Sequence, residues 1–131
     1  MTQRQDRLTL GRSRRMIRKG DFQRAFDGRC TAADSRLVLY VLPNELDGPR
    51  IGLAVGGRHG NAVQRNRLRR LLREAFRIEQ HNLPPGFDYL FVPRLGPQAD
   101  LATYRQALLR LASRAVRRWH SRPPQSPNPR P

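Results

Sequence analysis

The sequence has 131 residues, 37% of them apolar, which is enough for one domain with its own core. Only 10 Asp and Glu accompany 26 Lys and Arg, and the resulting net charge of +16 indicates a polyanionic partner, nucleic acid before an anionic membrane surface. No apolar run approaches the roughly 18 residues of a membrane-spanning helix, the polar start is unlike a secretory signal, and the single cysteine excludes an internal disulfide and favours a cytoplasmic location.

Helices and strands are predicted from apolar periodicity and from capping residues. Asp21, Asn61 and Asp100 are candidate N-caps, each followed by apolar residues at helical spacing. Runs of β-forming residues that end at turn residues predict the strands. In chain order we expect a basic lead-in (1–18), a helix from Asp21 that stops at Gly28, strands at 30–33, 36–42 and 51–55, a long helix after Asn61, a strand at 87–92 and a helix after Asp100.

This order, α-β-β-β-α-β-α, predicts an α+β sandwich in which helices cover a central sheet. We expect a single domain over residues 1–120, with nucleic acid as the partner that its charge favours. Residues 121–131 contain five prolines and no core-forming residue, so they are predicted to be a disordered tail.

The segment 61–77 carries the strongest functional signal. Its apolar residues fall on one stripe, so the helix is expected to present its other side to solvent. Arg65, Arg69 and Arg73 fall on one line of that side, with Asn66, Arg70 and Arg77 beside them. An ordinary solvated face mixes charges of both signs, whereas here Glu74 is the only acid between Arg65 and Arg77. A face that binds a polyanion is therefore favoured over an ordinary solvated face.

Two other features are open to two interpretations. The loop Gly56–Gly60, with Arg58 inside it, can offer backbone amides to phosphate, but it lacks the Gly-Lys-Ser/Thr ending of a nucleotide-binding loop. Phe22, Phe26 and Tyr40 either belong to the core, which their spacing alone favours, or line a cleft that stacks single-stranded bases.

Residues for independent catalysis are scattered. The acids show no paired spacing, and His59, His81, His120 and Cys30 are isolated in the sequence. The sequence therefore predicts neither a nuclease metal site nor a zinc site.

The run from Gly60 to Phe76 closely resembles the signature helix of the protein subunit of bacterial ribonuclease P. The match is carried by Gly60–Val63, by Arg65–Glu74 and by Phe76. Segments 21–26, 39–40, 50–55 and 88–94 are similar to the family in order and spacing, so the resemblance covers roughly residues 7–115. One departure is Gly56-Gly57-Arg58, where the family usually has a Ser-Lys-Lys/Arg type of stretch.

The resemblance implies a ribosomal protein S5 domain 2-like fold with a left-handed βαβ crossover. It also implies a function: the protein joins a large catalytic RNA that positions Mg²⁺ and removes the 5′ leader of precursor tRNA. The protein binds the leader and the catalytic RNA and lowers the Mg²⁺ requirement, with no metal expected on the protein itself. The implied contacts with the catalytic RNA are Arg65, Asn66, Arg67, Arg69, Arg70 and Arg73, and the implied leader-binding cleft comprises Phe22, Phe26, Tyr40 and Arg58.

Three alternatives remain at this stage. A ribosomal or other structural RNA-binding protein would share the charge and the fold class. A DNA-binding regulator is less favoured because no heptad zipper continues from the arginine-rich helix. A protein that cleaves RNA alone is the least favoured, because the residues for it are missing. No membrane partner and no DNA partner are expected.

Overall fold

The structure, a computed structural model, describes residues 19–122. Three α-helices and four β-strands alternate in the order that the sequence predicts. They are α1 (Lys19–Gly28), β1 (Thr31–Ala33), β2 (Leu37–Pro43), β3 (Arg50–Leu53), α2 (Ala62–Glu79), β4 (Phe87–Pro93) and α3 (Leu101–Ser121), with two 3-10 turns, η3 (Gly57–His59) and η4 (Gln80–Asn82).

The four strands form one mixed sheet in the order β1-β2-β4-β3. β2 is antiparallel to both β1 and β4, and its centre pairs Leu39 with Phe91. β3 is parallel to β4, with Ile51 opposite Tyr89, and α2 connects these two strands. The sheet therefore contains the βαβ unit that the resemblance implies, with β4 in the interior.

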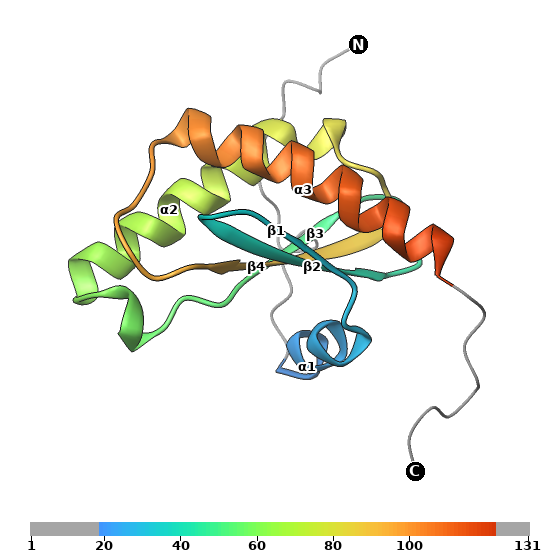
Figure 1. Ribbon diagram of the computed structural model, residues 1–131, viewed down its shortest axis with the longest axis horizontal. Helices are drawn as coiled ribbons and strands as arrows, with labels where there is room; N and C mark the ends of the chain where they lie inside the picture. Colours follow the sequence, from blue (N-terminus) through green and yellow to red (C-terminus); the bar gives the residue numbers. More distant parts are fainter. Residues whose placement is uncertain (1–18, 123–131) are drawn as a thin grey trace.

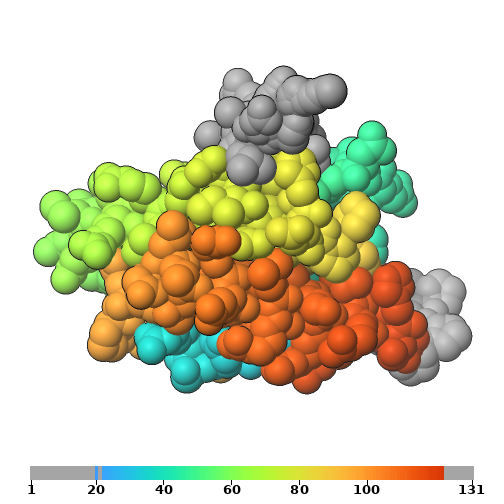
Figure 2. Space-filling view, turned by 90° about the horizontal axis from the view of Figure 1, so that it is seen from above, coloured from blue at the N-terminus to red at the C-terminus, as the bar shows by residue number. Residues whose placement is uncertain are grey.

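The helices form layers on both faces of the sheet (Figure 1). α2 and α3 lie on one face and α1 lies alone on the other. The alternation along β2 reflects this arrangement: Leu37, Leu39 and Val41 are fully buried in the core shared with α2 and α3, whereas Tyr40 turns towards α1. β4 is buried along almost its whole length because both of its faces are covered. Figure 2 shows α2 and α3 side by side across the outer surface.

A buried polar cluster fixes the edge where β3 joins the sheet. The side chain of Asp88 is 3% exposed and accepts two hydrogen bonds from the guanidinium of Arg50, at 2.8 and 2.6 Å. Asn44 donates a further hydrogen bond to it at 2.9 Å. Because every charge in this cluster has a partner, the parallel strand is tied to β4 without an unpaired buried group.

Several predicted strand boundaries differ from the structure by one residue, and three further differences concern α1, β3 and α3. α1 begins at Lys19, so Asp21 lies inside its first turn and is not its N-cap. β3 ends at Leu53 and not at Val55, although Ala54 still donates its amide to Phe91 O. Ser121, assigned to the tail, is the last residue of α3. The lead-in 1–18 and the tail beyond Arg122 lie outside the described residues.

Candidate nucleic-acid interface

The arginine-rich helix α2 begins at a well-defined cap. The Asn61 side chain accepts a hydrogen bond from Gln64 N at 2.9 Å, and Gln64 Oε1 accepts from Asn61 N at 2.8 Å. This reciprocal capping box satisfies two amides that the helix start leaves without partners. Gly60 precedes it with φ +119°, and a Cβ there would lie 2.2 Å from Gln64 Oε1. The Gly60-Asn61 step therefore sets where α2 starts and how it leaves the loop.

The stripe predicted for α2 is confirmed. Its apolar side packs into the core through Leu68, Leu72, Ala75 and Phe76, all buried. The arginines on the remaining surface are of two kinds. Arg65 and Arg69 are half-buried, whereas Arg67, Arg70 and Arg73 are exposed.

The half-buried arginines hold the loop between β3 and α2. Arg65 Nη1 donates to Gly60 O at 2.9 Å. Arg69 Nη2 donates to Val55 O at 3.0 Å, and its Nη1 donates to Asn66 Oδ1 at 3.1 Å. The two guanidinium groups therefore bind carbonyls at both ends of the loop, so part of their hydrogen-bonding capacity is used inside the protein.

His59 closes the same loop from within. Its Nδ1 accepts from Gly56 N at 3.1 Å, and its Nε2 lies 2.8 Å from Pro93 O at the end of β4. A carbonyl can only accept, so Nε2 carries the proton and the ring is the neutral tautomer. This use of the Gly56 amide removes one of the groups expected to be available for phosphate. Arg58, in the same turn, remains exposed.

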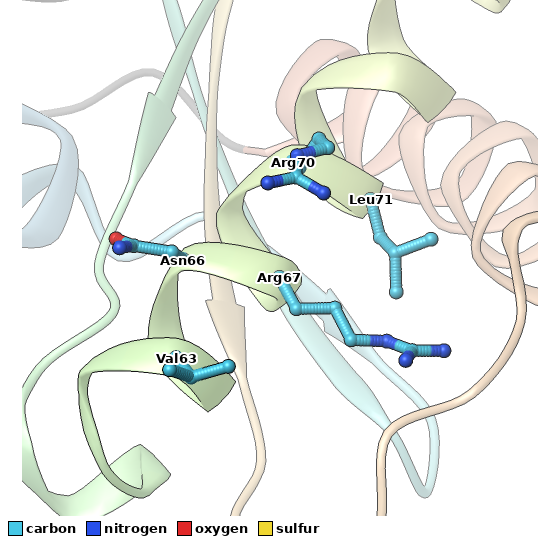
Figure 3. A pocket seen from close by; sticks show the side chains of 5 residues that line it. All are labelled: Val63, Asn66, Arg67, Arg70 and Leu71. Carbon is cyan, nitrogen blue, oxygen red and sulfur yellow. The ribbon is translucent and has the colours of Figure 1, made fainter.

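The exposed arginines flank a hollow of about 560 Å³ on the outer side of α2. It is lined by Val63, Asn66, Arg67, Arg70 and Leu71 (Figure 3). Arg67 and Leu71 extend to one side of the helix and Asn66 to the other. Neither Arg67 nor Arg70 has a hydrogen-bond or ion-pair partner within residues 19–122, so both guanidinium groups are available to a partner.

The one acid on this side does not neutralise the exposed arginines. Glu74 accepts a hydrogen bond from Arg77 Nε at 2.9 Å and forms an ion pair with the same guanidinium. The hydrogen bond from Arg77 lowers the pKa of Glu74, and the charge of Arg77 adds to the effect. Glu74 is thus paired with Arg77 and does not neutralise Arg67 or Arg70, so the electrostatic potential over these two residues stays positive.

The aromatic residues lie on the other face of the sheet. Phe22, Phe26 and Tyr40 pack around the buried Ala25 and Leu90. The rings of Phe26 and Tyr40 meet edge to face, with centroids 4.9 Å apart. All three aromatic side chains are half-buried, which agrees in part with both interpretations of the sequence: they pack, and part of each remains accessible. Ala54, which leads into the loop with Arg58, packs against the same cluster.

Sequence reasoning missed two contributors to this region. Val63 is 76% exposed in the middle of the basic surface, although it is a large apolar residue. Its position, five residues before Leu68 and therefore off the core stripe, is the signal that could have revealed it. The second is His59, whose contact with Pro93, 34 residues away, cannot be read from local sequence.

Within residues 19–122, no group of three or more His, Cys, Asp or Glu side chains is arranged to hold a metal ion. Of the helices that the structure describes, none is both long and apolar enough to cross a membrane.

Known proteins are similar to this chain in both sequence and architecture. The ribonuclease P family model matches residues 10–116, which is most of the chain. The chain belongs to the ribonuclease P protein family. A relative from Haemophilus influenzae, the ribonuclease P protein component, is 34% identical over 113 residues, covering 85% of this chain and 94% of that protein. The ribonuclease P protein component of Herpetosiphon aurantiacus is 37% identical over 114 residues, covering 86% and 92%.

Solved structures of the family agree with the fold. The ribonuclease P protein of Thermotoga maritima superimposes with a TM-score of 0.70 at 31% identity, covering 76% of this chain and 96% of that one. The Staphylococcus aureus protein gives a TM-score of 0.68 at 27% identity, covering 78% and 94%. The α+β fold class is confirmed, and family membership disfavours the alternative of a ribosomal RNA-binding protein.

Proposed function

We propose that the outer face of α2 binds the catalytic RNA of a ribonuclease P holoenzyme. The observation that carries this proposal is the pair Arg67 and Arg70, exposed and without partners among the described residues, on a helix whose nearby acid is already paired. Guanidinium groups bind phosphate through two parallel donors. Each phosphate that they neutralise releases counterions from the RNA, and this release drives the association. Arg73 and Asn66 extend the same surface. Arg65 and Arg69 contribute mainly by holding the β3–α2 loop.

The aromatic surface on the α1 side is proposed to bind the 5′ leader of precursor tRNA. Phe22, Phe26 and Tyr40 each combine a packed edge with an accessible one, and such rings stack on unpaired bases without sequence preference. Arg58 follows Ala54, which packs on this cluster, by four residues and would supply positive charge for the leader backbone. We place the protein in the cytoplasm, where both of these RNAs are made.

Mg²⁺ is proposed to be bound by the RNA and not by this protein. Magnesium prefers oxygen ligands, above all carboxylates and phosphates. The α2 face offers guanidinium groups, which repel the ion. The arginines can instead neutralise RNA phosphates that would otherwise need Mg²⁺, so the protein would lower the Mg²⁺ requirement while the RNA performs the hydrolysis.

The decisive experiment is cleavage of precursor tRNA by a bacterial catalytic RNA at low Mg²⁺, with and without the protein. We expect cleavage only when both are present, and no cleavage by the protein alone. Folded, RNA-bound protein that gives no stimulation would contradict the proposal and favour a structural RNA-binding role.

The leader site is tested with Phe22→Ala and Phe22→Leu. Loss of the ring should weaken binding of precursor tRNA by the holoenzyme about tenfold, with binding of mature tRNA unchanged, because each stacked base contributes roughly 1–3 kcal/mol. Leucine retains the apolar packing against Ala25 but cannot stack, so it separates stacking from folding. If Phe22→Leu binds both RNAs like the wild type, the ring serves the core and not the leader.

A further inference from the structure

Val63 is the feature of the α2 surface that phosphate binding does not explain. It is 76% exposed, and the core stripe of the helix does not include it. It lies at the second position of α2, one turn before Arg67, and it lines the same hollow as Arg67, Arg70 and Leu71. A helix that only follows an RNA backbone would gain nothing from an apolar side chain at this position.

The walls of the hollow combine three kinds of chemistry. Val63 and the half-buried Leu71 supply apolar surface, and Arg67 and Arg70 supply charged, planar donors. The amide of Asn66 has its oxygen engaged by Arg69, which leaves its NH₂ group as a donor. Figure 3 shows Arg67 and Leu71 extending to the same side of the helix.

We infer that this hollow receives a single unstacked nucleotide of the catalytic RNA. The face of its base or ribose would lie against Val63 and Leu71, and the phosphates on either side would bind Arg67 and Arg70. The inference rests on the proposed function and specifies the form of RNA that α2 recognises: an unpaired nucleotide and not a regular duplex.

The charge and the dimensions of the hollow support this occupant. A paired A-form helix exposes phosphates and hydroxyls to a protein surface of this kind, whereas a nucleotide turned out of the stack also offers an apolar face. The volume of about 560 Å³ is in the range of sites that hold one small molecule. The absence of acidic side chains among its five lining residues matches a polyanionic ligand better than a protein partner.

The test compares Val63→Ser with the double variant Arg67→Ala/Arg70→Ala. Binding to the bacterial catalytic RNA is measured across a series of salt concentrations, and Ala62→Ser, an exposed neighbour outside the hollow, is the matched control. Val63→Ser should weaken binding about fivefold at every salt concentration without changing the log–log slope, because it removes apolar contact and no charge. The double variant should weaken binding and also flatten the slope.

Chemical probing of unpaired bases gives the second readout. The wild-type protein and Ala62→Ser should protect at least one unpaired base of the RNA, and Val63→Ser should restore its reactivity. A Val63→Ser protein with wild-type affinity and protection would overturn the inference, and the proposed function would stand if the double variant still lost affinity. If the double variant also bound like the wild type, both would fail.

Discussion

α2 and α3 are two long helices with similar numbers of arginines that are arranged differently. α2 has six arginines and α3 has five, with no acidic residue in α3. In α3, Arg105 binds Glu79, Arg110 binds Asp34 at 2.6 Å, and Arg118 donates to Thr31 O at 2.6 Å. These side chains fasten α3 to α2 and to the β1–β2 edge of the sheet.

The arginines of α2 divide differently. Arg65 and Arg69 hold a loop, Arg77 pairs within its own helix, and Arg67 and Arg70 have no partner among the described residues. The comparison teaches that the number of arginines on a helix does not identify an RNA-binding face. What marks the candidate face is that two arginines without partners among the described residues, Arg67 and Arg70, line one hollow together with Asn66.

The largest effect is expected on RNA affinity, when the two arginines of α2 without partners among the described residues are removed. Arg67→Ala/Arg70→Ala should weaken binding to the catalytic RNA roughly a hundredfold, about tenfold per charged hydrogen-bonding group. The log–log salt slope should fall by about 1.5. Both are measured by titration of labelled RNA.

The matched control for this experiment is on α3. Arg114, which is half-buried, and Arg117, which is exposed, also have no hydrogen-bond or ion-pair partner within residues 19–122. Arg114→Ala/Arg117→Ala therefore removes the same charge from the other helix. We expect a change within about twofold, since two distant charges act only through a screened field. A loss of affinity equal to that of the α2 variant would show that α3 is a second RNA-binding face and that the two helices do not differ in this respect.

A smaller effect, on the stability of the protein, is expected from removing the ion pair between Arg105 of α3 and Glu79 of α2. Arg105→Ala removes the ion pair of the Glu79 carboxylate, whose side chain is only 6% exposed, and leaves the hydrogen bond that Asn82 donates to it. The free energy of unfolding should fall by about 2 kcal/mol, less than for a fully buried pair because Arg105 is 41% exposed. Denaturant titration measures this loss. Glu79→Gln in the same variant should recover part of it, and failure to do so would show that the buried charge is not the cause.

The smallest effect is expected at Asp34, whose contribution to the free energy of unfolding depends on pH. Partial burial opposes ionisation of this carboxyl, but hydrogen bonds from the amides of Arg36 and Leu37 and the charge of Arg110 outweigh it, so its pKa is lowered. A lowered pKa in the folded state stabilises the protein above the unfolded value of about 4, and this contribution is lost as the pH falls below it. We expect Asp34→Asn to cost less than about 1 kcal/mol at pH 7. The difference from wild type should shrink towards pH 2, and a constant difference would contradict the assignment.

The order of the elements could be predicted because it follows from local sequence patterns, namely capping residues and apolar periodicity. The Asn61 cap and the stripe of Leu68, Leu72 and Phe76 depend only on residues within a few turns of one another, and both are confirmed. The start of α1 at Lys19 was missed because Asp21 is a residue type favoured at N-caps, yet it lies inside the helix.

The roles within the site could be predicted only in part. Nothing in the sequence separates Arg69 from Arg70, although one binds Val55 O and the other is exposed. That distinction arises from the tertiary fold, which brings the end of β3 beside one side of α2 only. The exposure of Val63 has the same origin, since no element of the described chain covers this part of the helix.

The unequal covering of the two faces of the sheet has a consequence for motion. α2 and α3 share a large continuous core with the sheet, whereas α1 is attached through a cluster with only two fully buried residues, Ala25 and Leu90. Local opening of α1 therefore exposes little apolar surface and costs much less than global unfolding, so its amide hydrogens exchange with solvent before those of the other two helices. A leader strand stacked on Phe22 and Phe26 would bind to the least stable layer of the protein and would slow that exchange.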